Sequence, residues 1–385
     1  MSKFLAPKNL TVDKSPEAAK DILNLVIRSD VNDYYISIGQ KPFIRRQGFF
    51  SEVSDAPEID NEKLEAILEF LLGKKRYEEA TASIANKQAY HFSGSLSAEL
   101  DGVERACRYR AILVSSLNGP ELTVRVLDRN LLELNTLGLA QEHYEKVIET
   151  LQRGRGLILV TGPTGAGKST TLAAMIQHLI NNYPFHVVTL EDPVEFLYKP
   201  SLAQGHHAFS MVTQRSVNVD CGSYQQGLMD ALRMKPEVIA IGEIRDAATM
   251  RTVIDAAETG HLIIGTMHAS TVHQAIDRII SQAGADARIM RQMLSKNLRC
   301  VIAQNLLTTA DSTEENPKRV LCYEALFRTK EAQAAISKDA EITQAMMDEL
   351  ITDSGGITWD NCLEGLVKDG FVSEAEAVTH RVSDQ

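Results

Sequence analysis

The sequence predicts an α/β protein of two domains, a small α+β domain followed by a larger domain built on a parallel sheet. Three observations support this fold class. The chain has 385 residues, 44% of them hydrophobic and 24% charged, which is enough for two buried cores. Strand-like segments dominate up to about residue 128. After residue 140, short apolar runs alternate with apolar residues at helical spacing, which is typical of a parallel sheet with crossover helices.

The first domain is expected to cover residues 1–130. Its polar start gives way at Ser15 to apolar residues at helical spacing, and Ser15 is a suitable N-cap. A second helix is expected to end at Gly73, since glycine commonly follows the last turn of a helix. The strands, separated by turn residues, are expected at residues 34–38, 43–48, 90–96, 107–114 and 122–127.

A linker at residues 131–139 is expected to lead into the second domain at residues 140–385. The pattern predicts a helix over residues 141–152 and then a buried strand at 156–161. Further buried strands are expected at residues 187–190, 238–241 and 262–267. From about residue 286 the apolar spacing predicts helices to the end of the chain. The residues that would share one helix face there are Ile289, Met293, Leu294, Leu298, Val301 and Ile302.

The most informative stretch lies between the strand at 156–161 and the helix that follows it. It matches the phosphate-binding pattern G-x-x-x-x-G-K-[ST] and consists of Gly162, Pro163, Thr164, Gly165, Ala166, Gly167, Lys168, Ser169 and Thr170. Backbone N–H groups of such a loop and the positive end of the helix dipole hold phosphate oxygens. Lys168 would reach the β- and γ-phosphates, and the Ser169 hydroxyl would bind Mg²⁺. The pattern therefore predicts a site for ATP and Mg²⁺.

Acidic residues follow two of the predicted strands, where the carboxyl ends of a parallel sheet face a ligand crevice. Glu243 comes just after an apolar strand, an arrangement by which nucleotide hydrolases hold the Mg²⁺ shell. After the strand at 187–190, Pro193 forces a turn that would bring Glu195 back toward Glu191. A carboxylate there could orient or deprotonate an attacking water. The alternative is that these acids are solvated or locally paired.

Histidines stand at both ends of the strand at 262–267. His268, at the carboxyl end, is the candidate for sensing the γ-phosphate or a neighbouring subunit, although a lone histidine is as often a structural residue. His261 lies too far from it to share a metal. The adjacent His206 and His207 are interpreted as part of a loop, because neighbouring side chains diverge and no third ligand is near.

The net charge and the positions of the cysteines argue against several classes of function. The formal net charge of −11 argues against a protein whose main surface binds nucleic acid, so no direct nucleic-acid partner is expected. The five cysteines are scattered without a C-x-x-C pair, and neither a disulfide framework nor a zinc site is predicted. No apolar run approaches the ~20 residues of a membrane span, and no signal-peptide core follows the first residues. We therefore expect a cytoplasmic protein.

Four motifs resemble those of the hexameric ATPases that drive type IV pili and related secretion and conjugation systems. They are the P-loop, an aspartate box at 191–196, a Walker B element at 231–246 and a histidine box at 257–268, in the family's order. The resemblance implies a RecA-like P-loop ATPase domain with a helical C-terminal region. It also implies a PAS-like N-terminal domain, which residues 29–48 match more loosely. By this resemblance Glu195 is the catalytic base, and Glu243 positions Mg²⁺ and water.

The same resemblance implies further contacts and partners. Arg110 and Arg125 match arginines that the N-terminal domains of such enzymes bring to bound nucleotide. A homo-oligomer of six copies is implied, and a ring agrees with the usual need of a P-loop domain for an arginine in trans. The expected partner is an inner-membrane platform protein of a pilus or secretion machine, so the protein would be peripheral at the inner membrane.

Two departures from the family bear on the cellular role. The chain lacks the four-cysteine zinc module of the type II branch. In place of the Ala-Ile-Arg segment of the retraction ATPases, it offers only Ala335-Ile336-Ser337. A conjugation or type IVB secretion role therefore fits at least as well as pilus retraction. Two other classes stay open, a DNA-translocating or helicase-like ATPase on the same core and a scaffold that binds ATP with negligible hydrolysis.

Overall fold

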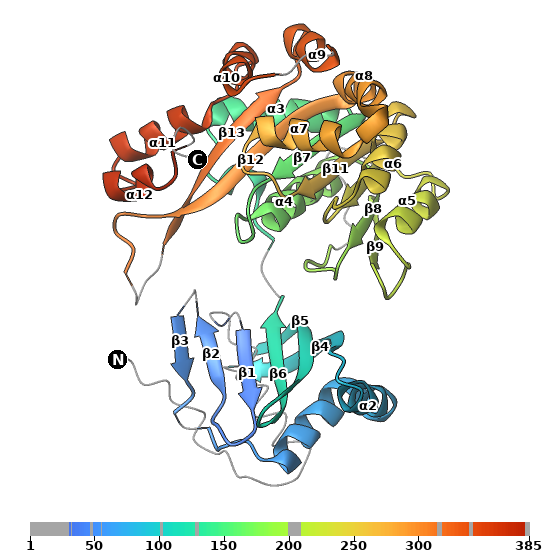
Figure 1. Ribbon diagram of the computed structural model, residues 1–385, viewed down its shortest axis with the longest axis vertical. Coiled ribbons are helices and arrows are strands. Elements are labelled where there is room, and N and C mark those ends of the chain that lie inside the picture. The colour runs from blue at the N-terminus through green and yellow to red at the C-terminus, as the bar shows by residue number, and fades with distance from the viewer. Residues whose placement is uncertain are drawn as a thin grey trace. The chain divides into compact units, whose positions relative to one another are not determined.

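The computed structural model describes residues 31, 33–46, 49–54, 56–100, 103–127, 131–198, 209–313, 318–338 and 342–381. The chain divides into two compact units, Met1–Asn130 and Leu131–Gln385 (Figure 1). The division falls where the sequence places the end of the first domain. The helix expected from Ser15 and the pair His206 and His207 lie outside the described residues.

The smaller unit is an antiparallel sheet packed against a helix. Its strands, in the order β3-β2-β1-β6-β5-β4, are β1 (Asp33–Ser37), β2 (Phe43–Arg46), β3 (Phe49–Glu52), β4 (Tyr90–Leu100), β5 (Val103–Ser116) and β6 (Gly119–Val126). Tyr34 and Ile36 on β1 are buried in one core with Ile67 of α2 (Asn61–Ala85), whereas Tyr35 between them is only half-buried. This alternation is typical of a sheet with one covered face.

Two expectations for the smaller unit need correction. The strand expected at 43–48 is shorter, because β2 ends at Arg46 and pairs with a separate strand β3. Four residues are too few for the sequence to show a strand period. The helix expected to end at Gly73 is broken there, with φ 69° and ψ 162°, but a second helical segment continues to Ala85. The residues after Gly73 include strong helix formers and no further glycine or proline.

The larger unit is built on a seven-stranded sheet in the order β13-β12-β7-β11-β10-β8-β9. Its strands are β7 (Gly156–Thr161), β8 (His186–Glu191), β9 (Met211–Ser216), β10 (Val238–Ile241), β11 (Leu262–Met267), β12 (Leu298–Thr308) and β13 (Arg319–Phe327). Neighbouring strands are parallel except β12 and β13, so the predicted parallel sheet is confirmed. The helices are α3 (Gln141–Gln152), α4 (Lys168–Asn182), α5 (Tyr224–Leu232), α6 (Ala247–Glu258), α7 (Val272–Gln282), α8 (Ala287–Asn297), α9 (Lys330–Ser337), α10 (Gln344–Asp353), α11 (Trp359–Lys368) and α12 (Glu374–Val378).

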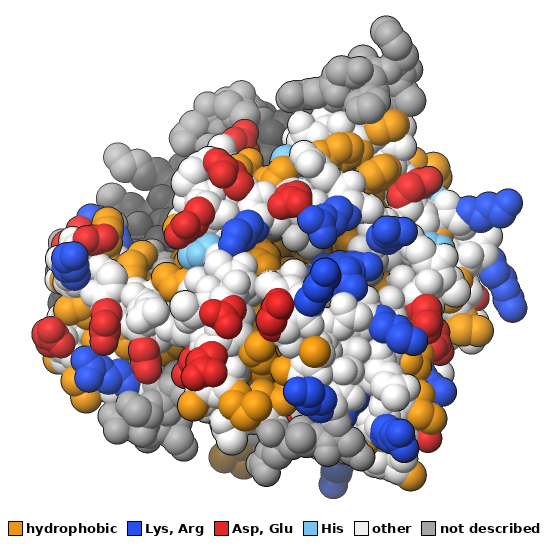
Figure 2. All heavy atoms as spheres, turned by 90° about the horizontal axis from the view of Figure 1, so that it is seen from above, with side chains coloured by type: hydrophobic (Ala, Val, Ile, Leu, Met, Phe, Trp, Pro, Cys, Tyr) orange, Lys and Arg blue, Asp and Glu red, His pale blue; other side chains and the backbone are white. Residues whose placement is uncertain are grey.

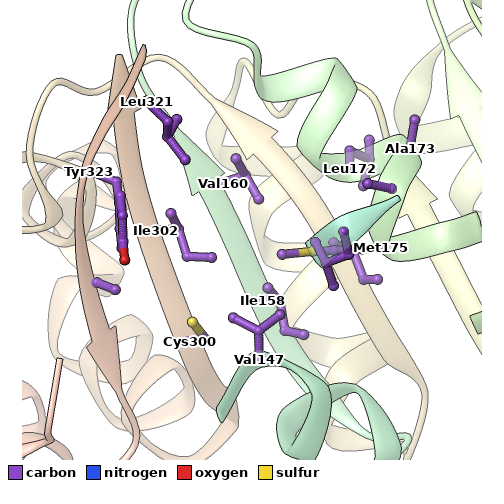
Figure 3. Close-up of a cluster of buried hydrophobic side chains, with 14 of the residues drawn as sticks. Val147, Ile158, Val160, Leu172, Ala173, Met175, Cys300, Ile302, Leu321 and Tyr323 are labelled. Atoms are coloured by element: carbon purple, nitrogen blue, oxygen red, sulfur yellow. The ribbon is translucent and has the colours of Figure 1, made fainter. Parts of the chain in front are cut away.

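The central strands are buried on both faces, so the sheet separates two hydrophobic cores. On β7, Ile158 and Val160 belong to one cluster and Leu157 and Leu159 to the other, and all four are fully buried. In Figure 3, Ile158 and Val160 lie among labelled side chains of α3, α4 and the strands β12 and β13. Burying a side chain of this size stabilises a fold by about 1.5–3 kcal/mol. Strands anchored in this way hold the loops at their ends in fixed positions.

The prediction of helices from about residue 286 to the end of the chain is wrong for two segments, which form the strands β12 and β13. After α8, β12 pairs in parallel with β7, and β13 pairs antiparallel with β12. Leu298, Val301 and Ile302, expected on a helix face with Met293, are therefore strand residues. Residues 300–303 of β12 form a short apolar run that is buried on both faces, and periodicity does not distinguish such a run from a buried helix segment. Helices resume only at Lys330.

Candidate active site

Four neighbouring strands of the larger unit end at one edge of the sheet. β7, β11, β10 and β8 are adjacent and parallel, so their carboxyl ends lie side by side. β7 leads into the P-loop, β8 ends on Glu191, and β10 and β11 are followed by Glu243 and His268. Ligands of open α/β sheets bind at this edge. The fold therefore collects residues that are far apart in the chain.

The P-loop depends on glycines whose backbone conformations other residues rarely adopt. Gly162, Gly165 and Gly167 have φ values of 149°, 84° and 83°. A Cβ on Gly162 would lie 2.2 Å from the carbonyl oxygen of Gln304, so this position has no room for a side chain. Gly167 is the N-cap of α4, whose first N–H groups face the loop. Exposed at the loop tip are Pro163, Thr164 and Gly165.

Lys168 is the first residue of α4, and its amine turns back over the loop. Its Nζ donates hydrogen bonds to the carbonyl oxygens of Gly162 at 2.9 Å and Pro163 at 2.8 Å. Burial lowers the pKa of the Lys168 amine, and the nearby negative charge of Glu243 acts in the opposite direction. Of the other motif residues, Ala166 is fully buried, Ser169 is exposed and Thr170 is half-buried.

Gln304 on β12 supports the P-loop, a role that the sequence did not reveal. It is 1% exposed, and its amide donates to the carbonyl oxygen of Ala166 at 2.6 Å. Its Oε1 accepts a hydrogen bond from Thr171 Oγ1 at 2.9 Å. These contacts fix the end of the loop and the first turn of α4 together. A strand assignment for residues 298–308, next to the P-loop strand, is the signal that would have identified Gln304.

Glu243 is the centre of a network of charged side chains. Its Oε1 lies 3.0 Å from Nε2 of His268, and its Oε2 accepts a hydrogen bond from Nε of Arg245 at 2.7 Å. Arg245 also lies 3.7 Å from a carboxylate oxygen of Asp192, so one guanidinium links two acidic residues. The hydrogen bond to Glu243 raises the pKa of Arg245. Of the residues expected at the site, the structure thus brings Glu243, His268 and Lys168 together.

Glu191 and Glu195 lie at the two ends of the turn after β8. Glu191 is a local structural partner, since its Oε2 accepts from the N–H of Glu195 at 3.2 Å and its Oε1 accepts from Thr189 Oγ1 at 2.6 Å. Burial raises the pKa of the Glu191 carboxyl. The Glu195 carboxylate is half-buried and, within the described residues, forms no hydrogen bond or ion pair. Its oxygens are therefore available to a ligand or water.

Arg110 and Arg125 lie in the smaller unit, directly opposite each other on β5 and β6. Arg125 Nε donates to Oδ1 of the buried Asp33 at 2.6 Å, which fixes its position on the sheet. The Asp33 carboxylate offsets the charge of Arg125 and so reduces the repulsion between two like charges at paired positions. The contact of the two arginines with bound nucleotide stays a prediction.

The residues at the carboxyl edge of the larger sheet fit a nucleoside triphosphate and Mg²⁺. Gly165 has no side chain and no atom lies within 4 Å of its missing Cβ, so a phosphate group can approach the backbone of the loop there. Lys168 supplies a positive charge from the first turn of α4. The exposed Ser169 hydroxyl and the Glu243 carboxylate offer oxygen atoms, the ligand type that Mg²⁺ prefers.

A parallel sheet with a P-loop at its carboxyl edge and acidic residues on the adjacent strands defines a P-loop ATPase. Residues 83–354 match the family described as Type II/IV secretion system protein. The chain belongs to this family. The predicted ATP hydrolase of the pilus and secretion class is thereby confirmed.

Several relatives are similar over most of the chain. The chain is 31% identical to the type IV pilus retraction ATPase PilT of Pseudomonas aeruginosa over 361 residues, which cover 93% of this chain and 96% of that protein. It is 36% identical to a twitching motility protein of Neisseria gonorrhoeae, over 70% of this chain and 68% of that protein. The crystal structure of the pilus retraction motor PilT with bound ADP superposes with a TM-score of 0.79 at 30% identity, covering 94% and 96% of the two chains. The Legionella pneumophila ATPase DotB, at 23% identity and a TM-score of 0.79 over 97% of each chain, shares the fold.

Proposed function

We propose that the chain is a hexameric motor ATPase that powers pilus dynamics, type IVB secretion or conjugative transfer. The observation that carries this proposal is the meeting of the P-loop, Glu243 and His268 at one sheet edge, with Glu243 and His268 3.0 Å apart. The likeness to PilT over almost the whole chain supports a motor role.

In the proposed reaction a water oxygen attacks the γ-phosphorus of ATP, and the bond from that phosphorus to the β–γ bridging oxygen breaks. Glu195 takes the proton of the attacking water, because its carboxylate has no partner in the described part of the chain. Lys168 leaves the loop carbonyls and binds the β- and γ-phosphate oxygens. Mg²⁺, held by Ser169 and positioned by Glu243, would neutralise phosphate charge when bound.

The proposed ring supplies the remaining positive charge. Arg110 and Arg125 of the smaller unit would contact nucleotide, as the matching arginines of the family do, and a ring of copies lets a site form between protomers. Relative motion of the two units about the linker 131–139 would convert hydrolysis into mechanical work. The resemblance of these positions to the family's arginines and the paired placement of Arg110 and Arg125 support these roles.

The proposed place of action is the cytoplasmic face of the inner membrane, on a platform protein of a pilus or secretion machine. Relatives named as a type IV pilus ATPase and a type II secretion system ATPase support this assignment. Within the described ranges, no helix combines the length and the apolar character needed to cross a membrane.

The experiment that tests the proposal is the ATPase rate against protein concentration, with the mass of the assembly measured in parallel. We expect the rate per protomer to rise steeply as a ring forms. A second series adds single- and double-stranded DNA, which should leave the rate unchanged. A rate that does not depend on concentration, and that DNA raises severalfold with a steep dependence on salt, would instead establish a DNA translocase.

A further inference from the structure

Four arginines gather at the amino end of the same sheet, opposite the P-loop. Arg153 and Arg155 lie between α3 and β7, Arg299 is the second residue of β12, and Arg328 directly follows β13. Since β12 is parallel to β7 and antiparallel to β13, these positions meet at one edge. We call them the arginine cluster. Figure 2, seen from above the view of Figure 1, shows Lys and Arg side chains gathered near the middle of the face.

Local backbone features place Arg299 in the arginine cluster. The pairing of β12 with β7 shifts register between Leu298 and Cys300, which leaves Arg299 as the extra residue of a β-bulge. Bulges re-aim side chains and are frequent near functional sites. The Arg299 side chain lies over Gly156, where a Cβ would come within 2.4 Å of its Nε. This Nε donates to the carbonyl oxygen of Arg155 at 3.3 Å.

The charges of the arginine cluster reinforce one another. The N–H of Arg328 donates to the carbonyl oxygen of Arg299 at 2.9 Å, which joins these two positions through the backbone. Burial, and then the charges of Arg328, Arg155 and Arg153, lower the pKa of Arg299. Of these four arginines, only Arg153 has an acidic partner within the described residues, Glu149 at 2.6 Å. Arg328 donates to the neutral side-chain amide of Gln333 at 3.0 Å. Like charges gathered in this way destabilise the fold unless an anion offsets them.

We propose that the arginine cluster is a docking surface for an acidic segment of a protein partner. All four residues are arginines, whose planar guanidinium groups bind carboxylates through paired hydrogen bonds. The apolar side chains beside Arg299 and Arg328, among them Leu298, Phe327 and Ile336, are buried and offer little surface to a partner. A segment rich in acidic side chains would therefore bind the arginine cluster through its charge.

A narrow segment fits this surface better than an anionic membrane does. The chain carries a net charge of −11, so a broad negative surface that approached the whole face would be repelled by the remaining acidic residues. Stable attraction to lipid commonly needs about four to eight basic residues spread over the contact. In the arginine cluster, only Arg153, Arg155 and Arg328 are exposed, while Arg299 is half-buried. A peptide can follow this short row and leave the acidic surface in water.

The test measures binding of a short fluorescein-labelled peptide of alternating glutamate and glycine by fluorescence anisotropy. The full chain is compared with the double variant Arg155→Gln/Arg328→Gln. The matched control is Arg319→Gln/Lys368→Gln, which removes the same charge at exposed positions of the same unit. We expect the cluster variant to bind at least about tenfold more weakly than the wild type and the control. Its ATP turnover should be unchanged, which separates this proposal from the proposed function.

Two further results bear on the proposal. Peptide binding to the wild-type chain should weaken strongly as salt is raised, because it depends on charge. Vesicles of phosphatidylcholine and phosphatidylglycerol, and inorganic phosphate, are tested beside the peptide. Equal peptide affinity of the wild type and the cluster variant would overturn the proposal, and so would an equal loss in the control. Binding of vesicles or phosphate with no binding of the peptide would overturn it as well.

Discussion

The two ends of the central sheet differ in their charged side chains. At the carboxyl end, Glu243 contacts both His268 and Arg245, and Lys168 lies close enough to sense its charge. At the amino end, only Arg153 of the arginine cluster has an acidic partner among the described residues, and the other three arginines have none. Acidic and basic side chains placed together can stabilise the charges that develop during a reaction. A group of basic side chains alone is complementary to an acidic binding partner. One rigid sheet can therefore serve two tasks.

The largest expected effect separates the two ends. Replacing Lys168 by alanine removes the amine that faces the P-loop, and we expect no measurable ATP turnover, because nothing else in the loop offers a positive side chain. The measurement is phosphate release by the purified variant. The arginine-cluster variant Arg155→Gln/Arg328→Gln is the matched comparison and should keep the wild-type rate. Undiminished turnover of Lys168→Ala would remove the basis for the assigned site.

Alanine substitutions at different glycines of the P-loop should differ in their effects on ATP binding and stability. In Gly162→Ala the new Cβ would collide with the carbonyl oxygen of Gln304, so we expect weaker ATP binding and a free energy of unfolding lower by about 1–3 kcal/mol. Gly165→Ala is the control, since its φ is also positive but no atom lies within 4 Å of the new Cβ. Thermal unfolding and nucleotide titration measure both. Equal losses in the two variants would show that backbone strain, and not the contact with Gln304, decides the result.

A buried glutamate near the carboxyl ends of the strands should make the free energy of unfolding depend on pH. Glu324 on β13 is 0% exposed and accepts a hydrogen bond from the N–H of Val272 at the start of α7. Burial raises its pKa from 4.5 to about 7, and Asp348 and Asp360 add to this. Between these two pKa values the native state retains a proton that the unfolded chain releases. The stabilisation of the native state by this proton is therefore complete below pH 4.5 and is lost as pH rises through about 7.

The variant Glu324→Gln should remove this pH dependence. Over that window the wild type should lose about 3 kcal/mol more of its free energy of unfolding than the variant, since each pKa unit corresponds to about 1.36 kcal/mol. Denaturant unfolding at a series of pH values measures the difference. Parallel curves for the two proteins would show that the Glu324 carboxyl titrates normally.

The smallest expected effect compares the two histidines at the ends of β11. His268→Ala removes a partner of Glu243 at 3.0 Å, and we expect about tenfold slower turnover, the value of one hydrogen bond to a charged group. His261→Ala is the control at the amino end, where the imidazole Nδ1 lies within hydrogen-bond distance of Thr259 Oγ1 and of the carbonyl oxygen of Ala256. Its turnover should stay within about twofold of the wild type. A similar loss in both variants would assign the effect to β11 as a whole.

Much of the carboxyl end could be predicted from the sequence. The strands expected at 156–161, 238–241 and 262–267 coincide with β7, β10 and β11, because each is a short, fully buried apolar run with clear boundaries. The P-loop spacing located the turn between β7 and α4, and the acidic and histidine motifs located the neighbouring loops. Motifs of this kind are visible because backbone geometry requires particular residues at fixed positions.

The rest depends on contacts between distant segments. β12 was interpreted as helix because burial on both faces removes the alternation that marks a strand, and with it the support of Gln304 for the loop was missed. β9 and α5 were not predicted, since their short patterns are ambiguous alone. Arg155, Arg299 and Arg328 become neighbours only through the pairing of three strands. No motif or residue spacing in the sequence predicts such a cluster.

The most direct test of the central claim is a paired measurement of ATP binding and turnover in Glu195→Gln. The substitution keeps the shape of a side chain that has no hydrogen-bond partner in the described part of the chain, so ATP affinity should be retained. Turnover should fall by roughly a hundredfold or more, as for loss of a general base. Wild-type turnover with normal affinity would show that Glu195 does not activate the water. It would then contradict the mechanism assigned to the carboxyl end of the sheet.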